Sequence, residues 1–303
     1  MKKYGMPYKG SKSKIAEQII NTLPEAEWFV DLFGGGGAVS HCAALSIKYK
    51  YVLYNEIEPL VFKAFQMARN GDYKCETRRI IREDFLKLKD TDPYAAICYS
   101  FGNDLKTYAY SKELEAWKRA LHYARQLKDR SKLAEFGIIS DGSRRDIIRH
   151  KDEYRRLYAE WLGNNFQCPD EIERCQSLEN LQSLESLESL KRLESLTRLE
   201  SLKRLESLSY EKVELPENAV IYCDIPYKST NTYLSMFNHN DFYKWALSQK
   251  QDVFISEYDM PDEFYLVTEF DRVSLLSPNS RETMKERLYC NHKYETDKQL
   301  TLF

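Results

Sequence analysis

Apolar positions along the chain recur at two spacings, which predict helices and buried strands in alternation. Pro24 ends the first segment, in which four apolar residues recur at the spacing of one helix face: Ile15, Ile19, Ile20 and Leu23. A continuous apolar run at 28–32 then predicts a buried strand, the glycines at 34–37 a loop, and the residues from Ala38 a second helix. A second strand is expected within 49–59 and ends in acidic residues. This order is that of a β-loop-α-β unit.

Further strands are predicted on both sides of a long region that lacks a strand pattern. They are expected at 92–103, 210–215, 219–224, 252–258 and 286–291. Residues 104–175 are mostly helical in pattern and rich in Lys and Arg, which indicates an insertion. Strands that alternate with helices predict a mainly parallel sheet, in which ligands bind beyond the carboxyl ends of the strands.

Residues 178–208 form a tandem repeat with leucine at every third position. On a straight helix each of these leucines would fall back by about 60°, so the repeat gives no single apolar stripe. Three charge pairs at i,i+4 nevertheless favour a helix: Glu188 with Arg192, Glu194 with Arg198, and Glu200 with Arg204. A helix and a small solenoid-like stack both remain open. A spacer outside the catalytic core is expected; the alternative is an oligomerisation or partner-binding module, which no other sequence feature supports.

Composition and charge limit the class of protein. The 303 residues, 43% of them hydrophobic, suffice for one α/β domain with an insertion or for two small domains. A net charge of -2 means that any contact with DNA must come from a local basic face. The seven cysteines include no C-x-x-C pair, which favours reduced thiols in a cytoplasm and no structural metal. No apolar run approaches the length of a membrane span, so neither secretion nor membrane insertion is expected.

Two common nucleotide-binding motifs are disfavoured, one at the glycine loop and one near the N-terminus. A dinucleotide fingerprint would need glycine at one of two positions that hold Val39 and Ser40, and a phosphate loop would need lysine where Ser11 stands. An aspartate before the loop, Asp31, and an acid at the end of the next strand, Glu56, instead suit an adenosine whose ribose hydroxyls need an acceptor. A purely structural turn is the alternative.

The tetrapeptide Asp224-Ile225-Pro226-Tyr227 ends an apolar strand. An amine conjugated to a heterocycle is a poor nucleophile, and acceptors that bind both of its N–H groups favour the pyramidal form that can attack. Asp224 supplies one acceptor and the carbonyl of Ile225 another, while Pro226 restricts the preceding residue to an extended conformation. Tyr227 offers a face on which a flipped base can stack. The alternative is an ordinary turn at the end of a strand.

Several motifs, in order, resemble the Dam-like adenine-N6 DNA methyltransferases, particularly a phage-type subgroup. The segment 6–15 resembles their N-terminal cofactor motif, with Tyr8 at its aromatic position and Lys12 at the lysine that meets the methionine moiety. Residues 31–37 resemble motif I through Asp31, Phe33, Gly35 and Gly37. Glu56 resembles the ribose-binding acid, residues 224–227 resemble the D-P-P-Y motif, and 254–258 resemble the following strand. The match runs along nearly the whole chain except the repeat.

The resemblance implies an α/β fold, a Rossmann-like sheet that binds S-adenosyl-L-methionine. Residues 1–103 and 209–303 would form the catalytic domain, 104–177 an inserted, mainly helical target-recognition region, and 178–208 the Leu-rich repeat. It implies site-specific methylation of adenine N6 in double-stranded DNA, with the base flipped and no metal required. Ile225 departs from the family's first proline but keeps the carbonyl. In the preceding strand, Ser209 and Tyr210 replace an Asp-aromatic pair that meets the cofactor's adenine.

Contacts with DNA are expected from two segments. Asn103 and Lys106 resemble the family's loop near the DNA, and Arg145, Arg149 and Arg156 could share one face of a helix. A solvated, salt-bridged helix is the alternative for those arginines. The subgroup indicates a phage or restriction-modification enzyme in the cytoplasm, that of the bacterial host if a phage encodes it. Rival functions are methylation of cytosine N4 or of RNA, and a catalytically degenerate protein that only binds DNA.

Overall fold

The computed structural model describes residues 4–136, 181–193, 201–227, 237–273 and 283–293. The chain divides into two compact units. The sheet unit contains residues 1–6, 10–71 and 192–303, and the helical unit contains 7–9 and 72–191.

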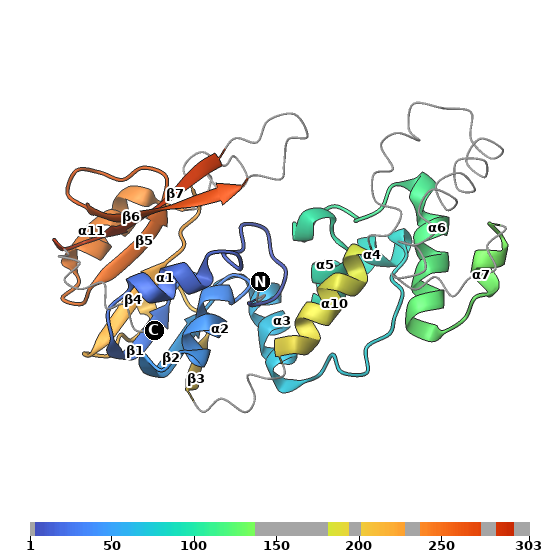
Figure 1. Cartoon of the computed structure of the whole chain (residues 1–303), viewed down its shortest axis with the longest axis horizontal. Coiled ribbons are helices and arrows are strands. Elements are labelled where there is room, and N and C mark those ends of the chain that lie inside the picture. Colours follow the sequence, from blue (N-terminus) through green and yellow to red (C-terminus); the bar gives the residue numbers. More distant parts are fainter. Residues whose placement is uncertain (1–3, 137–180, 194–200, 228–236, 274–282, 294–303) are drawn as a thin grey trace, which may run out of the picture. The chain divides into compact units, whose positions relative to one another are not determined.

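A seven-stranded sheet is the centre of the sheet unit, with the order β3-β2-β1-β4-β5-β7-β6 (Figure 1). Its strands are β1 (Ala26–Asp31), β2 (Tyr49–Asn55), β3 (Leu202–Glu206), β4 (Ala219–Cys223), β5 (Val253–Glu257), β6 (Tyr265–Val273) and β7 (Thr283–Cys290). The five neighbouring strands β3, β2, β1, β4 and β5 pair in parallel, and β7 is antiparallel to both β5 and β6. The prediction of a mixed α/β fold with a mainly parallel sheet is confirmed.

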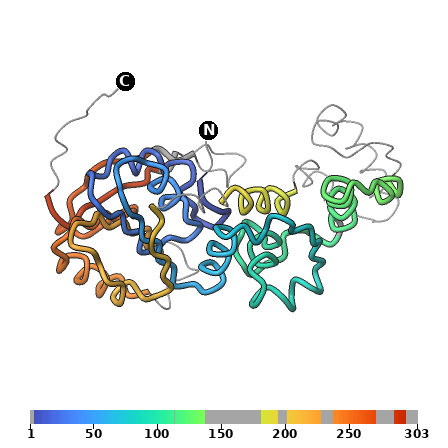
Figure 2. The backbone as a smooth tube through the Cα atoms, turned by 90° about the horizontal axis from the view of Figure 1, so that it is seen from below, coloured from blue at the N-terminus to red at the C-terminus, as the bar shows by residue number. Residues whose placement is uncertain are grey.

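Helices pack on both faces of this sheet: α1 (Ala16–Thr22), α2 (Ala38–Leu45), α3 (Pro59–Asn70) and α11 (His239–Ser248). Figure 2 shows α11, in orange, on one side of the sheet and the first helices, in blue, on the other. Local chemistry fixes the helix ends. The Asn238 side chain caps α11 by accepting from the amides of residues 240 and 241, and Gly71, in the left-handed region, ends α3.

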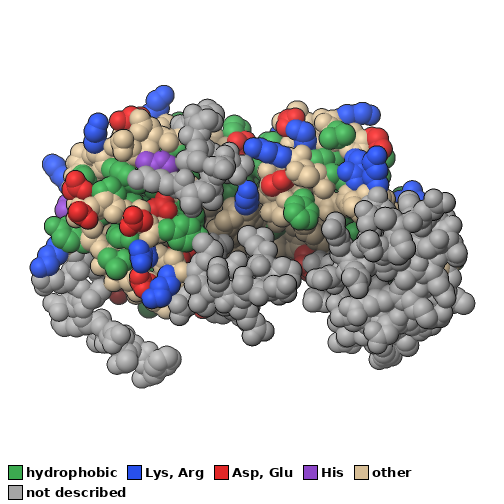
Figure 3. All heavy atoms as spheres, turned by 90° about the horizontal axis from the view of Figure 1, so that it is seen from above, with side chains coloured by type: hydrophobic (Ala, Val, Ile, Leu, Met, Phe, Trp, Pro, Cys, Tyr) green, Lys and Arg blue, Asp and Glu red, His purple; other side chains and the backbone are tan. Residues whose placement is uncertain are grey.

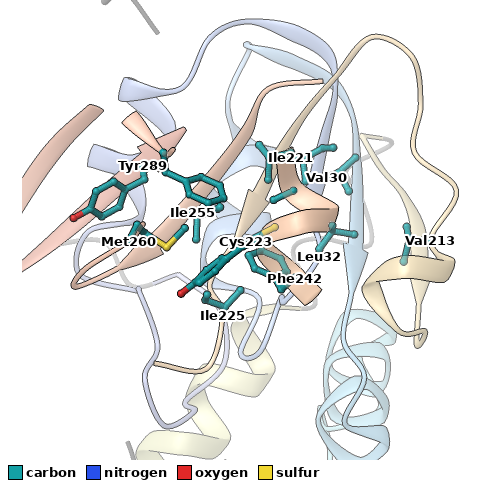
Figure 4. Close-up of a cluster of buried hydrophobic side chains, with 14 of the residues drawn as sticks. Val30, Leu32, Val213, Ile221, Cys223, Ile225, Phe242, Ile255, Met260 and Tyr289 are labelled. Atoms are coloured by element: carbon teal, nitrogen blue, oxygen red, sulfur yellow. The ribbon is translucent and has the colours of Figure 1, made fainter. Parts of the chain in front are cut away.

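A buried cluster joins α11 to the sheet (Figure 4). Val30, Ile221 and Val253 lie in register on three neighbouring strands, so their side chains form one row on the same face. Phe242 and Ala246 of α11 pack on that face and are fully buried. Full burial of each aliphatic side chain contributes about 1.5–3 kcal/mol, so this row holds the central strands in place.

The helical unit contains α4 (Arg82–Leu88), α5 (Pro93–Tyr99), η1 (Phe101–Asn103), α6 (Lys112–His122), η2 (Tyr123–Leu127), α7 (Ser131–Ala134) and α10 (Gln182–Arg192). Helix α5 overturns the strand predicted at 92–103. The Asp92 carboxylate caps it by accepting from the amides of residues 94 and 95, and Pro93 occupies its first position. All seven residues of α5 are buried, and a short continuous apolar run gives no periodicity that separates a buried helix from a buried strand.

Three further strand assignments need correction. The strand predicted at 210–215 is wrong, because Tyr210–Lys212 forms a 3-10 turn, η5. The sequence reading also missed β6, and it did not consider a strand within the repeat, where β3 lies.

The repeat adopts two structures from the same letters. Residues 187–196 and 199–208 are both L-E-S-L-K-R-L-E-S-L, yet residues 187–192 belong to helix α10 and residues 202–206 form strand β3. In α10 the leucines at 184, 187 and 190 are buried within the helical unit, whereas Leu202 is buried against the sheet. Of the two structures left open for the repeat, residues 182–192 form a helix, and the expectation of a spacer outside the catalytic core is wrong for 202–206, which form a strand of the sheet.

Residues after β3 fix its register. The amide of Glu56 donates to the carbonyl of Glu206 at 3.1 Å, and the Asn55 side chain both donates to and accepts from the backbone of Leu208, at 3.0 Å each. The strand is thus aligned from its C-terminal end. Among the residues that the structure describes, no helix is long and apolar enough to cross a membrane.

Candidate active site

The predicted site residues follow the parallel strands at one edge of the sheet. Asp31 ends β1, Glu56 follows β2 and Asp224 follows β4. Because these strands are parallel, their carboxyl ends meet at the same edge, where an α/β sheet binds its ligands. The structure thus brings together acids that are far apart in the sequence.

One lysine is shared by two carboxylates in this site. Lys12 Nζ lies 2.5 Å from Asp224 Oδ1 and 3.0 Å from Glu286 Oε1, and the side chains of Lys12 and Glu286 are almost fully buried. Burial by itself would lower the pKa of Lys12, but the charges of Asp224 and Glu286 outweigh it and hold that pKa above its ordinary value. Lys12 therefore stays an ammonium ion.

The ring of Tyr227 is held from several sides. Its hydroxyl donates to Glu286 Oε1 at 2.7 Å, Lys12 Nζ lies 4.9 Å from its centroid, and the ring of Tyr258 lies 4.7 Å away. Burial, with the nearby carboxylates Asp224 and Glu286, raises the pKa of Tyr227 far above its usual range. The side chain is accordingly a neutral phenol that donates a hydrogen bond to the Glu286 carboxylate.

The backbone of the tetrapeptide is supported by packing and by a histidine. The Ile225 side chain is 2% exposed and lies in the core cluster near Cys223, Phe242 and Met260 (Figure 4). The carbonyl of Pro226 accepts a hydrogen bond from His239 Nε2 at 2.8 Å. Where the family has its first proline, this chain therefore fixes the residue by burying an isoleucine side chain.

The glycine loop between β1 and α2 has no room for side chains at two positions. A Cβ on Gly34 would lie 2.2 Å from the Tyr54 ring, and one on Gly37 would lie 2.2 Å from the Phe65 ring. Gly37 also has a φ of +67°, a conformation that L side chains rarely adopt. Close packing as well as backbone conformation thus requires glycine here.

Asp31 is a buried acid with one acceptor left over. Its Oδ2 accepts from the Ser40 hydroxyl at 2.6 Å, while Oδ1 is buried and makes no hydrogen bond among the described residues. Burial raises the pKa of Asp31 to about 7, and the charges of Asp224 and Glu56 act in the same direction. A buried, unsatisfied acceptor favours the binding of a donor, above all a cationic one.

Glu56 binds the glycine loop itself. Its Oε2 accepts from the amide of Gly35 at 2.7 Å and its Oε1 from the amide of Glu58 at 2.8 Å. Burial raises the pKa of Glu56, and these backbone donors partly offset that rise. Its predicted bond to a ribose stays a prediction, to which the structure adds a role in shaping the loop.

Aromatic side chains lie beside the loop. The ring of Phe33 lies 5.6 Å from Tyr210 and 5.7 Å from Phe242. The 3-10 turn η5 thus brings Tyr210 beside Phe33, the residue before the glycine loop, with Ser209 where the family pattern has an acid.

Of the residues predicted to contact DNA, two belong to the helical unit and three lie outside the described residues. The Asn103 amide donates to the carbonyl of Ile97 at 2.7 Å and to the hydroxyl of Ser186 at 3.2 Å, so it ties the turn η1 to helix α10. Lys106 is exposed, Tyr8 is half-buried, and both lie in the helical unit. Arg145, Arg149 and Arg156 lie outside the described residues. On the face in Figure 3, positive and negative side chains are interspersed.

Sequence reasoning missed Glu286 and His239 as parts of the site. Glu286 shares a face of β7 with Leu288 and Cys290, and all three are fully buried. An acid at the alternating apolar positions of a strand was the signal that could have identified it.

Comparison with known proteins agrees with this geometry. A family model described as D12 class N6 adenine-specific DNA methyltransferase matches residues 8–285. No curated protein matches the chain. Among the residues that the structure describes, no group of three or more His, Cys, Asp or Glu side chains could hold a metal ion.

Proposed function

We propose a residue-level mechanism for this chain, which belongs to the D12 class of N6 adenine-specific DNA methyltransferases. The protein is therefore an enzyme that methylates adenine N6 in DNA. The mechanism rests on one observation. Lys12 contacts Asp224 and lies beside the ring of Tyr227, at the edge of the sheet where β1 ends at Asp31 and the glycine loop begins.

The residues present fit S-adenosyl-L-methionine, the methyl donor that such enzymes use. Asp31 Oδ1, the acceptor without a partner among the described residues, binds the donor's cationic amino group in our proposal, and Lys12 lies toward the methionine end. Gly35 and Gly37 carry no side chains, so the donor can approach the backbone closely. Phe33, Tyr8 and Glu56 provide the remaining contacts that the family pattern implies. When bound, the donor supplies a methyl group on a sulfonium sulfur, which takes the electron pair of the breaking bond.

The tetrapeptide prepares the amine. Asp224 and the carbonyl of Ile225 accept the two N–H groups of adenine N6, which localises the lone pair that attacks the methyl carbon. The base stacks on Tyr227, whose ring is already fixed by Glu286. Attack leaves a positive charge on N6, which the Asp224 carboxylate stabilises until the proton passes to solvent water, so no strong base is needed.

Target recognition is assigned to the inserted region. In our proposal, residues 103–177 contact double-stranded DNA and select the site, with Asn103, Lys106 and the arginines at 145, 149 and 156 as contacts, while the sheet unit, which includes β3 at 202–206, carries the catalytic residues. Selection of one site suits a phage or restriction-modification enzyme. Its DNA substrate and the absence of disulfides among the described cysteines support action in the cytoplasm, that of a bacterial host if a phage encodes it.

Transfer of labelled methyl from S-adenosyl-L-methionine to unmethylated duplex DNA, followed by nucleoside analysis, tests this mechanism. Label is expected in N6-methyladenine, and Asp224→Ala should abolish it. Asp262→Ala, an exposed acid of the same unit, is the matched control and should retain activity. If Asp224→Ala transfers methyl at the wild-type rate, Asp224 has no catalytic role; if folded wild-type protein transfers none, a DNA-binding protein without turnover takes the place of the enzyme.

A further inference from the structure

Glu286 is a buried carboxylate to which the mechanism gives only the support of Tyr227. It lies on β7, one residue beyond the segment that the family model matches. Its Oε1 accepts the hydroxyl of Tyr227 at 2.7 Å and lies 3.0 Å from the ammonium of Lys12. One oxygen atom thus contacts both the hydroxyl of Tyr227 and the ammonium that also contacts Asp224 Oδ1.

The Lys12 ammonium contacts one oxygen of the carboxylate that the mechanism assigns to the base. Lys12 Nζ lies 2.5 Å from Asp224 Oδ1, so an amine that binds this oxygen must share it with Lys12 or displace the lysine. A buried ammonium that loses its only carboxylate is strongly destabilised. Without a second carboxylate, opening Asp224 for the base would therefore be costly.

We propose that Glu286 is a positioning residue that retains Lys12 when Asp224 turns to the amine of the flipped base, and that fixes the ring of Tyr227 at the same time. This inference rests on the mechanism proposed above. Lys12 can move off Asp224 Oδ1 and keep an ion pair with Glu286, since both carboxylates already contact the same ammonium. Glu286 acts through Lys12 and Tyr227 and does not touch the base.

The charges of the site support this assignment. Asp224 and Glu286 both contact the ammonium of Lys12, while Tyr227 stays neutral. In our proposal these carboxylates place negative charge near the amine, where positive charge develops as the N–C bond forms and the C–S bond breaks. A neutral side chain at 286 would both bind Lys12 less well and leave that charge less stabilised.

Glu286→Gln tests the role of the charge, because the amide oxygen can still accept the Tyr227 hydroxyl. Single-turnover methyl transfer should show a rate constant about 10- to 100-fold lower, the range seen when a supporting partner of a functional group is removed. The amplitude should stay at that of wild type, since a folding defect lowers the amplitude and a positioning defect lowers the rate constant. Glu286→Asp keeps the charge and should recover part of the rate.

Glu269→Gln is the matched control. Glu269 lies on the neighbouring strand β6 and pairs with Lys285 and Arg287 at the surface. It undergoes the same chemical change on the same strand pair, outside the site, and should leave the rate constant unchanged. An equal rate constant in Glu286→Gln and Glu269→Gln would overturn the proposal.

A stability measurement tests the contact with Lys12 without any turnover. In Lys12→Met the buried Glu286 and the partly buried Asp224 lose this cation, so adding Glu286→Gln removes an uncompensated buried charge and should raise Tm by several degrees. In the wild-type background the same substitution removes a partner of Lys12 and should not raise Tm. Equal changes of Tm in the two backgrounds would show that Glu286 and Lys12 are not coupled and would also overturn the proposal.

The two measurements keep this proposal distinct from the mechanism itself. If wild-type protein transfers no methyl group, the mechanism fails, and the Tm comparison still decides whether Glu286 holds Lys12. If wild-type protein methylates adenine and Glu286→Gln is equally fast, the mechanism stands and the role of Glu286 is refuted.

Discussion

Binding of S-adenosyl-L-methionine should become tighter as pH rises toward 7, because Asp31 must lose a proton to accept the donor's amino group. Burial raises the pKa of Asp31 from 3.8 to about 7 in the folded protein. The ionised fraction then grows from about 3% at pH 5.5 to about half at pH 7, which predicts a roughly 15-fold gain in affinity. The amino group of the donor stays cationic throughout this range, since α-amino groups titrate near about 7.7–8.

Isothermal titration calorimetry with S-adenosyl-L-methionine between pH 5.5 and 7 checks this expectation. Asp31→Asn should bind more weakly at pH 7 and should show a flat pH profile. Ser40→Ala removes the hydrogen bond that lowers the pKa of Asp31, so its profile should move to higher pH. An affinity of the wild type that does not change with pH, or a slope that persists in Asp31→Asn, would refute the reasoning.

The same pKa shift has a consequence for the free protein. Because the folded state binds the Asp31 proton more tightly than the unfolded state, its contribution to stability is present below the unfolded pKa and is lost as pH rises through about 7. The free energy of unfolding of the wild type should therefore fall relative to that of Asp31→Asn between about pH 4 and about pH 7, as measured by urea denaturation.

Three further changes test the fold around the site. Gly37→Ala should destabilise the protein by about 2–5 kcal/mol, from its positive φ and the clash with the aromatic ring beside it, whereas Gly102→Ala shares the positive φ, has open space and should cost only about 1–2 kcal/mol in chemical denaturation. Ile225→Ala should lower stability by about 2–5 kcal/mol and reduce the turnover rate, because a cavity loosens the residue whose carbonyl faces the amine; unchanged values of both would contradict this. Deletion of 201–206 should preserve the sheet and the activity, because the preceding hexad then supplies the strand residues, with threonine in place of an exposed lysine. Deletion of 202–206 instead places threonine at the position of the buried leucine and should lower Tm. Equal Tm values for the two deletions would contradict this.

Several features of the site are local in the sequence, and these were predictable. The apolar run that ends at Asp224, the glycines after β1 and the acid after β2 each depend on neighbouring residues, and the parallel order of strands then placed them at one edge. Conversely, the apolar run at 93–99 had no period that separates helix from strand, and it forms a helix that begins at the Asp92 cap and is buried within the helical unit.

The sequence by itself determined which residues carry charge, which segments are apolar and in what order the motifs follow, because these depend on residue type and short-range spacing. Tertiary structure alone decided that one decapeptide contributes a helix at 187–192 and a strand at 202–206, since each copy takes the partner that buries its leucines. It alone also brought Glu286 to Lys12 and Tyr227, from opposite ends of the chain. A buried charge needs a partner close to it in space. The position of that partner along the chain cannot be predicted from the residues around the charge.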